Sequence, residues 1–308
     1  MQQLVHQASC TSSQWTWYIS GVKDILNAPC LKFHSRDSDL NALMDWVYYH
    51  DVMSRFTLRH WHGDVLEIPP KPSNMCDNFV REVYMPVRSA MVSQDRNAVH
   101  SSDSSLLPNL ELLAELSDAV TANNCDSMSS HQLEDYKGYI RILDWRIRNI
   151  PMQSKSMYES EHAIVVELFK LATLIYLNRV TGDLLDQSGS IKGHLDRAFD
   201  LFSHMTYCER QYPLFIIGCE ARTDDQRMTV LDLISRTEKQ SSSRSLNHIK
   251  ILVQALWAQD DLADKEVDYW KKMSSVISNW FTSLNQGREN KLSEKTMVDF
   301  RDNETIMF

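Results

Sequence analysis

The chain has 308 residues, of which 43% are hydrophobic and 24% are charged. That composition is enough for one large apolar core or two smaller ones and argues against a disordered chain. The formal net charge is −9, and no run of Lys and Arg could neutralise phosphates. Direct binding of DNA or RNA by this chain alone is therefore not expected, nor is docking on an anionic membrane. Gly and Pro number only 8 each, which favours long helices joined by few loops.

The cysteines indicate a reducing compartment. Their gaps are wide and irregular, and none belongs to a Cys-x-x-Cys pair, so they predict buried thiols and neither a zinc site nor a dithiol redox motif. The six are Cys10, Cys30, Cys76, Cys125, Cys208 and Cys219. The N-terminus lacks a basic start followed by an apolar run, and the longest apolar stretch, 163–177, contains Glu167 and Lys170. We expect a soluble, intracellular protein.

Helical periodicity begins early in the chain and recurs in its middle. Over 39–61, large side chains at spacings of three and four residues form one stripe, made of Trp46, Tyr49, Met53, Phe56 and His60. The segment 68–73 is Pro-rich and predicts an extended link, and the polar segment 94–105 predicts a loop. A second helix is expected over 132–149, where Pro151 ends it and where Arg146 and Arg148 suit the negative end of the helix dipole.

The segment 159–179 is apolar around most of its circumference, which predicts a helix at the centre of the core. An amphipathic stripe follows over 191–205. Residues 214–217 could form a short strand, although burial within a helix is the favoured interpretation. Thr223 and Gln226 predict a capping box at the start of another helix. Two further helices are expected around 249–257 and 270–284, and the charged end from about residue 286 is expected to be loosely held.

An acidic motif is the sharpest sign of enzymatic chemistry. Asp260, Asp261 and Asp264 match the metal-binding motif of terpenoid synthases, in which carboxylates at this spacing chelate magnesium ions that hold a diphosphate. A second metal motif and a basic cluster for the diphosphate are both missing along the chain. The favoured interpretation is an acidic helix end followed by a short turn, because short motifs match by chance often.

The other candidates for chemistry are weak. His60 and His62 lie two residues apart, so they point to different sides of a helix and converge poorly on one metal ion. We expect His60 to be a hydrogen-bonded core histidine. No histidine lies near Cys208 or Cys219 in sequence to activate a thiol. The sequence therefore predicts no catalytic, cofactor-binding or metal-binding residue and no cofactor.

Two segments carry a resemblance to a known family. The first is 46–56, WVYYHDVMSRF, followed by LRHW at 58–61. The second is 212–221, YPLFIIGCEA, followed by Arg227, SLNH at 245–248 and LWAQD at 256–260. Together they resemble the fungal-specific transcription factor domain, the regulatory region of fungal zinc-cluster transcription factors. The likeness runs from about Trp15 to Leu284.

The resemblance implies an all-α fold, a multi-helix bundle or irregular helical array in one large domain. It places that domain at 15–284, between an N-terminal tail at 1–14 and a polar C-terminal tail at 285–308. It also implies residence in the nucleus, a role in controlling transcription and no catalysis. In the family the domain follows a six-cysteine zinc cluster and a basic linker. The cysteines of this chain cannot rebuild that cluster, so the sequence is either an incomplete gene product or a regulator that has lost its DNA-binding half.

Two functions from different classes follow from these observations. The first is a transcription regulator that acts through transcription-related proteins, as a homodimer or with related factors, and through a small-molecule effector. The alternative is a terpenoid-synthase-like, magnesium-dependent enzyme that uses Asp260, Asp261 and Asp264. A helical scaffold without a ligand is a third possibility. It differs from the transcription regulator only in having no effect on transcription.

Overall fold

The computed structural model describes residues 48–53, 56–57, 60, 106–120, 128–151, 161–185, 188–240, 244–263 and 268–278. Within these ranges the chain is helical and contains no strand, which confirms the all-α prediction. The helices are α5 (Leu107–Ala119), α7 (Ser130–Arg148), α8 (Glu161–Thr181), α9 (Ser188–His204), α10 (Gln211–Cys219), α11 (Asp224–Gln240) and α12 (Arg244–Leu262), with a 3-10 turn at Gly182–Leu185. Residues 48–53 and 269–278 are also helical.

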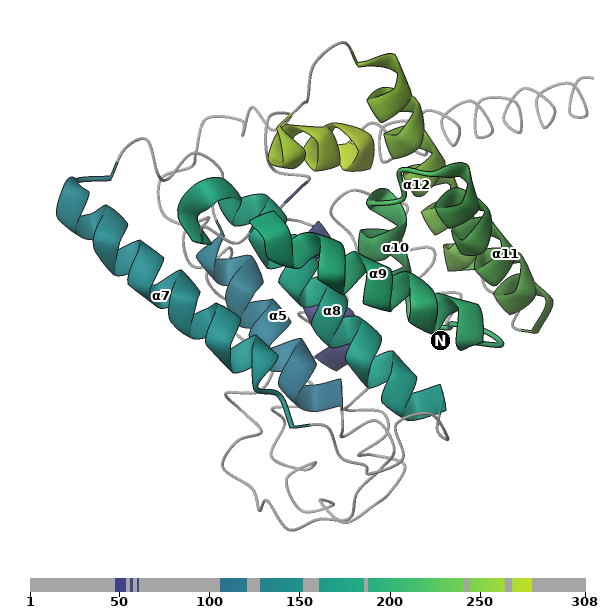
Figure 1. The fold of residues 1–308 in the computed structure, drawn as a ribbon, viewed down its shortest axis with the longest axis horizontal. Coiled ribbons are helices and arrows are strands. Elements are labelled where there is room, and N and C mark those ends of the chain that lie inside the picture. Colours follow the sequence, from purple (N-terminus) through teal and green to yellow (C-terminus); the bar gives the residue numbers. More distant parts are fainter. Residues whose placement is uncertain are drawn as a thin grey trace, which may run out of the picture.

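Helix α8 lies at the centre of the arrangement, as its apolar circumference predicted. In Figure 1, α5 and α7 lie to one side of it, and α10, α11 and α12 lie to the other. Its middle is buried on every face, and Phe169, Ile175 and Tyr176 have no exposed surface. A helix that is apolar all round is stable only when neighbours cover every side, because each exposed apolar face costs free energy.

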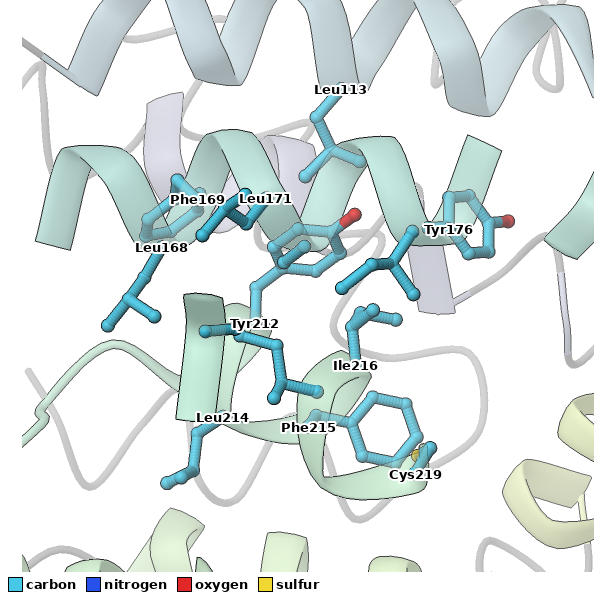
Figure 2. Close-up of a cluster of buried hydrophobic side chains, with 14 of the residues drawn as sticks. Leu113, Leu168, Phe169, Leu171, Tyr176, Tyr212, Leu214, Phe215, Ile216 and Cys219 are labelled. Carbon is cyan, nitrogen blue, oxygen red and sulfur yellow. The ribbon is translucent and has the colours of Figure 1, made fainter. Parts of the chain in front are cut away.

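The second buried helix is α10, which packs against both α8 and α12. Figure 2 shows Tyr212 and Ile216 of this helix facing the side chains of α8. Residues 214–217 are therefore helical, so the favoured interpretation of that segment is confirmed and the alternative strand is wrong.

Local sequence signals predict where several helices begin and end. The N-terminus of α11 has the predicted capping box, in which Gln226 N donates to Thr223 Oγ1 and Thr223 N donates to Gln226 Oε1, both at 3.3 Å. Arg146 and Arg148 lie in the last turn of α7, which ends before Pro151 as expected. Ser129 forms a second capping box at the start of α7 that the sequence reading did not single out.

One helix was missed by the sequence reading. Helix α5 buries Leu110, Leu113 and Leu116, whose spacing of three is a helical signal, and Pro108 lies in its first turn. The predicted link at 68–73, the loop at 94–105 and both tails lie outside the described residues. None of the helices within the described ranges combines the length and apolar character needed to cross a bilayer.

Candidate functional site

Asp260 and Asp261 of the acidic motif lie in the last turn of α12, at the helix end that the favoured interpretation expected. A carboxylate at the C-terminus of a helix is opposed by the negative end of the helix dipole, so it needs compensating cations nearby. For Asp260 there are two. Arg222 Nη1 donates to Asp260 Oδ2 at 2.7 Å, and Lys272 Nζ donates to the same oxygen at 2.6 Å. The Lys272 side chain is only 6% exposed, so this pair is largely shielded from water.

Asp261 pairs with a different cation. Arg227 forms a two-pronged contact, Nη1 to Asp261 Oδ2 at 2.8 Å and Nη2 to Oδ1 at 2.7 Å. The hydrogen bond from Arg227 is the main reason that the pKa of Asp261 lies below its usual value. The Arg227 guanidinium also lies over the face of Trp257, with its Cζ 5.4 Å from the ring centre. These contacts fasten the end of α12 to the start of α11.

This geometry argues against the magnesium alternative. A metal ion could bind Asp260 and Asp261 only by displacing three cations, because their carboxylates already accept charge-assisted hydrogen bonds. Arg222, Arg227 and Lys272 form a basic cluster that a search along the chain could not find, since the three residues come from separate segments. Within the described ranges, no group of three His, Cys, Asp or Glu side chains is placed to hold a metal. Asp264 and His62 lie outside those ranges.

A buried aromatic cluster is the second feature of the site. It brings together segments from both ends of the domain, at Phe56, His60, Tyr176, Tyr212, Phe215, Tyr269 and Trp270, and is called the aromatic cluster below. Phe56 is at its centre and meets the rings of Tyr176 and Tyr212 edge-on, at 5.1 Å and 5.4 Å. Edge-on contacts at this distance stabilise aromatic packing beyond area burial.

His60 is the polar centre of the aromatic cluster. It has no exposed surface, and its Nε2 is hydrogen-bonded to the Tyr176 hydroxyl at 2.9 Å. This confirms the prediction of a hydrogen-bonded core histidine. Its ring also lies 4.5 Å from that of Trp270. Burial lowers the pKa of His60 to about 3, so the imidazole is neutral at physiological pH.

Several polar atoms of the aromatic cluster lack a hydrogen-bond partner among the described residues. They are His60 Nδ1, Tyr269 Oη and Trp270 Nε1, all of them buried. Leaving such a group unpaired costs about 1–3 kcal/mol, and buried polar groups in native proteins nearly always have a partner. The cluster is therefore a buried aromatic region with a neutral histidine, in which some hydrogen-bonding groups have no partner among the described residues.

A buried ion pair adjoins the aromatic cluster. Arg179 of α8 donates from Nε and Nη2 to the two carboxylate oxygens of Glu220, at 3.1 Å and 2.6 Å. Glu220 is only 2% exposed. Its charge is one of the factors that, after burial, raise the pKa of the Tyr269 hydroxyl well above its ordinary value. The Tyr269 hydroxyl therefore keeps its proton and can donate it in a hydrogen bond.

The two cysteines within the described ranges are buried free thiols, as predicted. Burial raises the pKa of Cys208 to about 12 and that of Cys219 well above its ordinary value. A thiol that stays protonated is a poor nucleophile. The other four cysteines lie outside the described residues.

The sequence pattern located part of this site. It placed His60 and Trp270 on buried stripes, because both occur at helical spacing with other large side chains. It did not pair either of them with Tyr176 or Tyr269, since periodicity shows which face of a helix is buried but not which helix covers it.

Comparison with known proteins identifies the family. The model described as the fungal specific transcription factor domain matches residues 4–284. The transcription factor iacI of Pestalotiopsis fici is 38% identical over 277 residues, which are 89% of this chain and 66% of that protein. The chain thus spans just under two thirds of the length of this curated relative. No solved structure shows a significant match. The predicted domain boundaries at 15 and 284 stay predictions. The chain belongs to the family of fungal-specific transcription factor domains.

Proposed function

We propose that this chain is the regulatory region of a fungal transcription factor, and that it works in the nucleus through protein partners without contacting DNA itself. The observation that supports this most is the family match over 4–284 together with a relative named as a transcription factor. The net charge of −9 supports the second part, because a DNA-binding surface needs an excess of Lys and Arg.

A reporter experiment tests the regulatory role. The full chain is fused to an unrelated DNA-binding domain in a filamentous fungus, and transcription from a promoter carrying the matching operator is measured. We expect a several-fold change, in either direction, relative to the DNA-binding domain alone. An unchanged reporter, with the fusion shown to be folded and nuclear, would count against the proposal. Purification of the same fusion then shows whether transcription-related proteins accompany it.

The aromatic cluster supports a second part of the proposal, a small-molecule effector. Its side chains are mostly aromatic, its histidine is neutral, and Trp270 Nε1 and Tyr269 Oη can donate hydrogen bonds that no described residue accepts. These features favour a neutral, flat molecule that carries a carbonyl or hydroxyl oxygen. A charged effector would be opposed by the cost of burying its charge.

Native mass spectrometry of the chain purified from a fungal host tests this without knowledge of the effector. We expect an additional mass of a few hundred daltons that is lost on denaturation and is reduced in Trp270→Phe, which removes the indole N–H but keeps an aromatic ring. Trp145→Phe makes the same change at a side chain that is 63% exposed and should retain the mass. Apoprotein alone in the wild type would refute the effector and leave the regulatory role standing.

The enzymatic alternative has its own assay. Incubation of the chain with magnesium and prenyl diphosphates should give no product if Asp260 and Asp261 serve as partners of Arg222, Arg227 and Lys272. Turnover that Asp261→Ala abolishes would overturn the regulatory proposal in favour of the enzyme.

A further inference from the structure

His194 is a half-buried histidine through which α9 contacts α7. Both helices pack against α8, and Arg148 at the end of α7 lies beside the imidazole, with its Nη1 3.4 Å from His194 Nε2. An arginine side chain keeps its charge at every physiological pH and can only donate hydrogen bonds. His194 Nε2 is therefore the acceptor, and this contact requires a neutral imidazole. Protonation of His194 would remove the acceptor.

The same arginine also binds a buried carboxylate. Arg148 Nε donates to Asp144 Oδ2 at 2.8 Å, and Asp144 is only 5% exposed. The second carboxylate oxygen, Asp144 Oδ1, is buried and has no hydrogen-bond partner among the described residues. A buried acceptor without a partner is costly, and it is rare in native proteins. Asp144 Oδ1 can therefore accept a hydrogen bond from a donor that becomes available nearby.

The charged groups that face His194 from α7 and α8 act on it in opposite directions. Burial is the main reason that the pKa of His194 lies below its ordinary value, and the charge of Arg148 lowers it further. The Asp144 carboxylate raises the pKa, because a negative charge stabilises the imidazolium ion. Lys170 of α8 contributes a smaller lowering effect. The imidazole is therefore neutral near pH 7 and gains its proton below pH 6.5, the ordinary value.

We propose that His194 is an acid-sensitive switch that exchanges its partner on α7, from Arg148 when the ring is neutral to Asp144 Oδ1 when the ring is protonated. The imidazolium ion carries an N–H at both ring nitrogens and is repelled by Arg148 and Lys170. Asp144 offers it both a negative charge and an acceptor oxygen without a partner among the described residues. The carboxylate then accepts from Arg148 through Oδ2 and from His194 through Oδ1. Acid thus changes the geometry of the contact between α7 and α9, independently of the regulatory role.

Nuclear magnetic resonance of the full chain, with isotope-labelled histidine and arginine nitrogens, tests the switch between about pH 7.5 and about pH 4.5. His194→Gln identifies the ring signals of His194. We expect these signals and the Arg148 Nε–H signal to change with one common midpoint below pH 6.5. Asp144→Asn should lower the midpoint of His194 by about 0.5 or more, because the imidazolium ion loses its negative neighbour. Arg148→Gln should raise it by about as much, because a positive neighbour is removed.

The matched control is Asp200→Asn, the same change at a carboxylate of α9 that is 49% exposed and pairs with Arg197. It should leave the midpoint of His194 unchanged. Circular dichroism shows whether each variant is folded, and the wild-type titration decides the proposal if a variant is not. A His194 ring that stays neutral down to about pH 4.5 would overturn the switch. So would an Arg148 signal that does not respond while His194 titrates, or a midpoint that Asp144→Asn leaves unchanged.

Discussion

Gly218 shows how tightly the core is packed at the level of a single residue. It lies in α10, and an added Cβ would come within 3.1 Å of Val253 Cγ1 and 3.3 Å of Val230 Cγ1. Both neighbours are β-branched and have little rotamer freedom to move aside. Its carbonyl also accepts a hydrogen bond from Trp257 Nε1 at 2.8 Å. Because glycine has no side chain, α10 can lie this close to α11 and α12.

We therefore expect Gly218→Ala to lower the free energy of unfolding by about 1–2 kcal/mol, despite the better helix propensity of alanine. Gly193→Ala is the matched control within α9, where an added Cβ meets nothing within 4 Å. That substitution should instead raise the free energy of unfolding by up to about 1 kcal/mol. Urea denaturation of both variants measures the two values. Equal changes in the free energy of unfolding at the two glycines would show that the core accommodates a Cβ at position 218.

His60 gives the protein a specific dependence on pH. Its pKa is lowered from 6.5 to about 3 in the folded state because burial disfavours the charged ring. Below about pH 6.5 the unfolded chain binds a proton at this residue that the folded chain does not, so the free energy of unfolding falls with pH until about pH 3. One such proton corresponds to a slope of about 1.4 kcal/mol per pH unit.

We expect His60→Gln, which is neutral throughout, to reduce the slope of unfolding free energy against pH by about this amount between pH 6 and pH 4. His131→Gln makes the same change at a side chain that is 88% exposed and should retain the wild-type slope. Equilibrium unfolding at a series of pH values provides the comparison. If His60→Gln keeps the full slope, then another group, such as His50, whose pKa is lowered to about 4, dominates the acid sensitivity.

At the scale of elements, the end of α12 is held by two ion pairs that differ in exposure. The side chain of Asp260 is 16% exposed and that of its partner Lys272 is 6% exposed, whereas the side chain of Asp261 is 55% exposed. Breaking a buried pair leaves an uncompensated charge, while an exposed pair is screened by water. Asp260 and Asp261 should therefore contribute very differently to the free energy of unfolding, although they are adjacent and of the same type.

We expect Asp260→Asn to lower the free energy of unfolding by about 3 kcal/mol and Asp261→Asn by less than about 1 kcal/mol. Adding Lys272→Met to Asp260→Asn should recover a large part of the loss, because it removes the unpaired buried ammonium group. Chemical denaturation of the four proteins tests this. Equal losses for the two single variants would mean that Lys272 reaches water once Asp260 is neutral.

The described helices and their ends could mostly be predicted from sequence because each depends on local signals. The capping box at Thr223, the stop before Pro151 and the apolar circumference of α8 are examples. Helix α5 is harder to predict, because its leucines directly follow the Ser-rich segment 94–105, whose composition favours a loop. The contacts of the site could not be predicted in the same way. The approach of Lys272 to Asp260, and of Trp270 to His60, depends on which helix faces meet, and sequence periodicity does not contain that information.

At the scale of the whole molecule, α8 connects two groups of helices into one core. It packs against α5 and α7 on one side and against α9 and α10 on the other. Neither group can separate without exposing α8, whose buried side chains are mostly apolar. Stability should therefore be shared across the described helices, with no part that unfolds alone.

We expect urea to unfold the chain in a single transition, with the same midpoint whether it is followed by far-UV circular dichroism or by tryptophan fluorescence. The two signals sample the fold differently. Tryptophan fluorescence comes from individual side chains, such as Trp145 on α7 and Trp257 on α12, whereas circular dichroism reports every helix. Two separated transitions would contradict this and would divide the domain at α8.

The contact between His60 and Trp270 has a consequence for biosynthesis. Residues near the start of the domain complete their packing only against a helix near its end, with rings 4.5 Å apart. A ribosome adding about 5–20 residues per second takes some tens of seconds to synthesise the sequence between them. Throughout that time the side of the His60 ring that Trp270 covers in the folded protein remains exposed on the nascent chain. A transcript that stops before Trp270 would therefore yield a protein with an exposed aromatic surface, a substrate for chaperones and proteases.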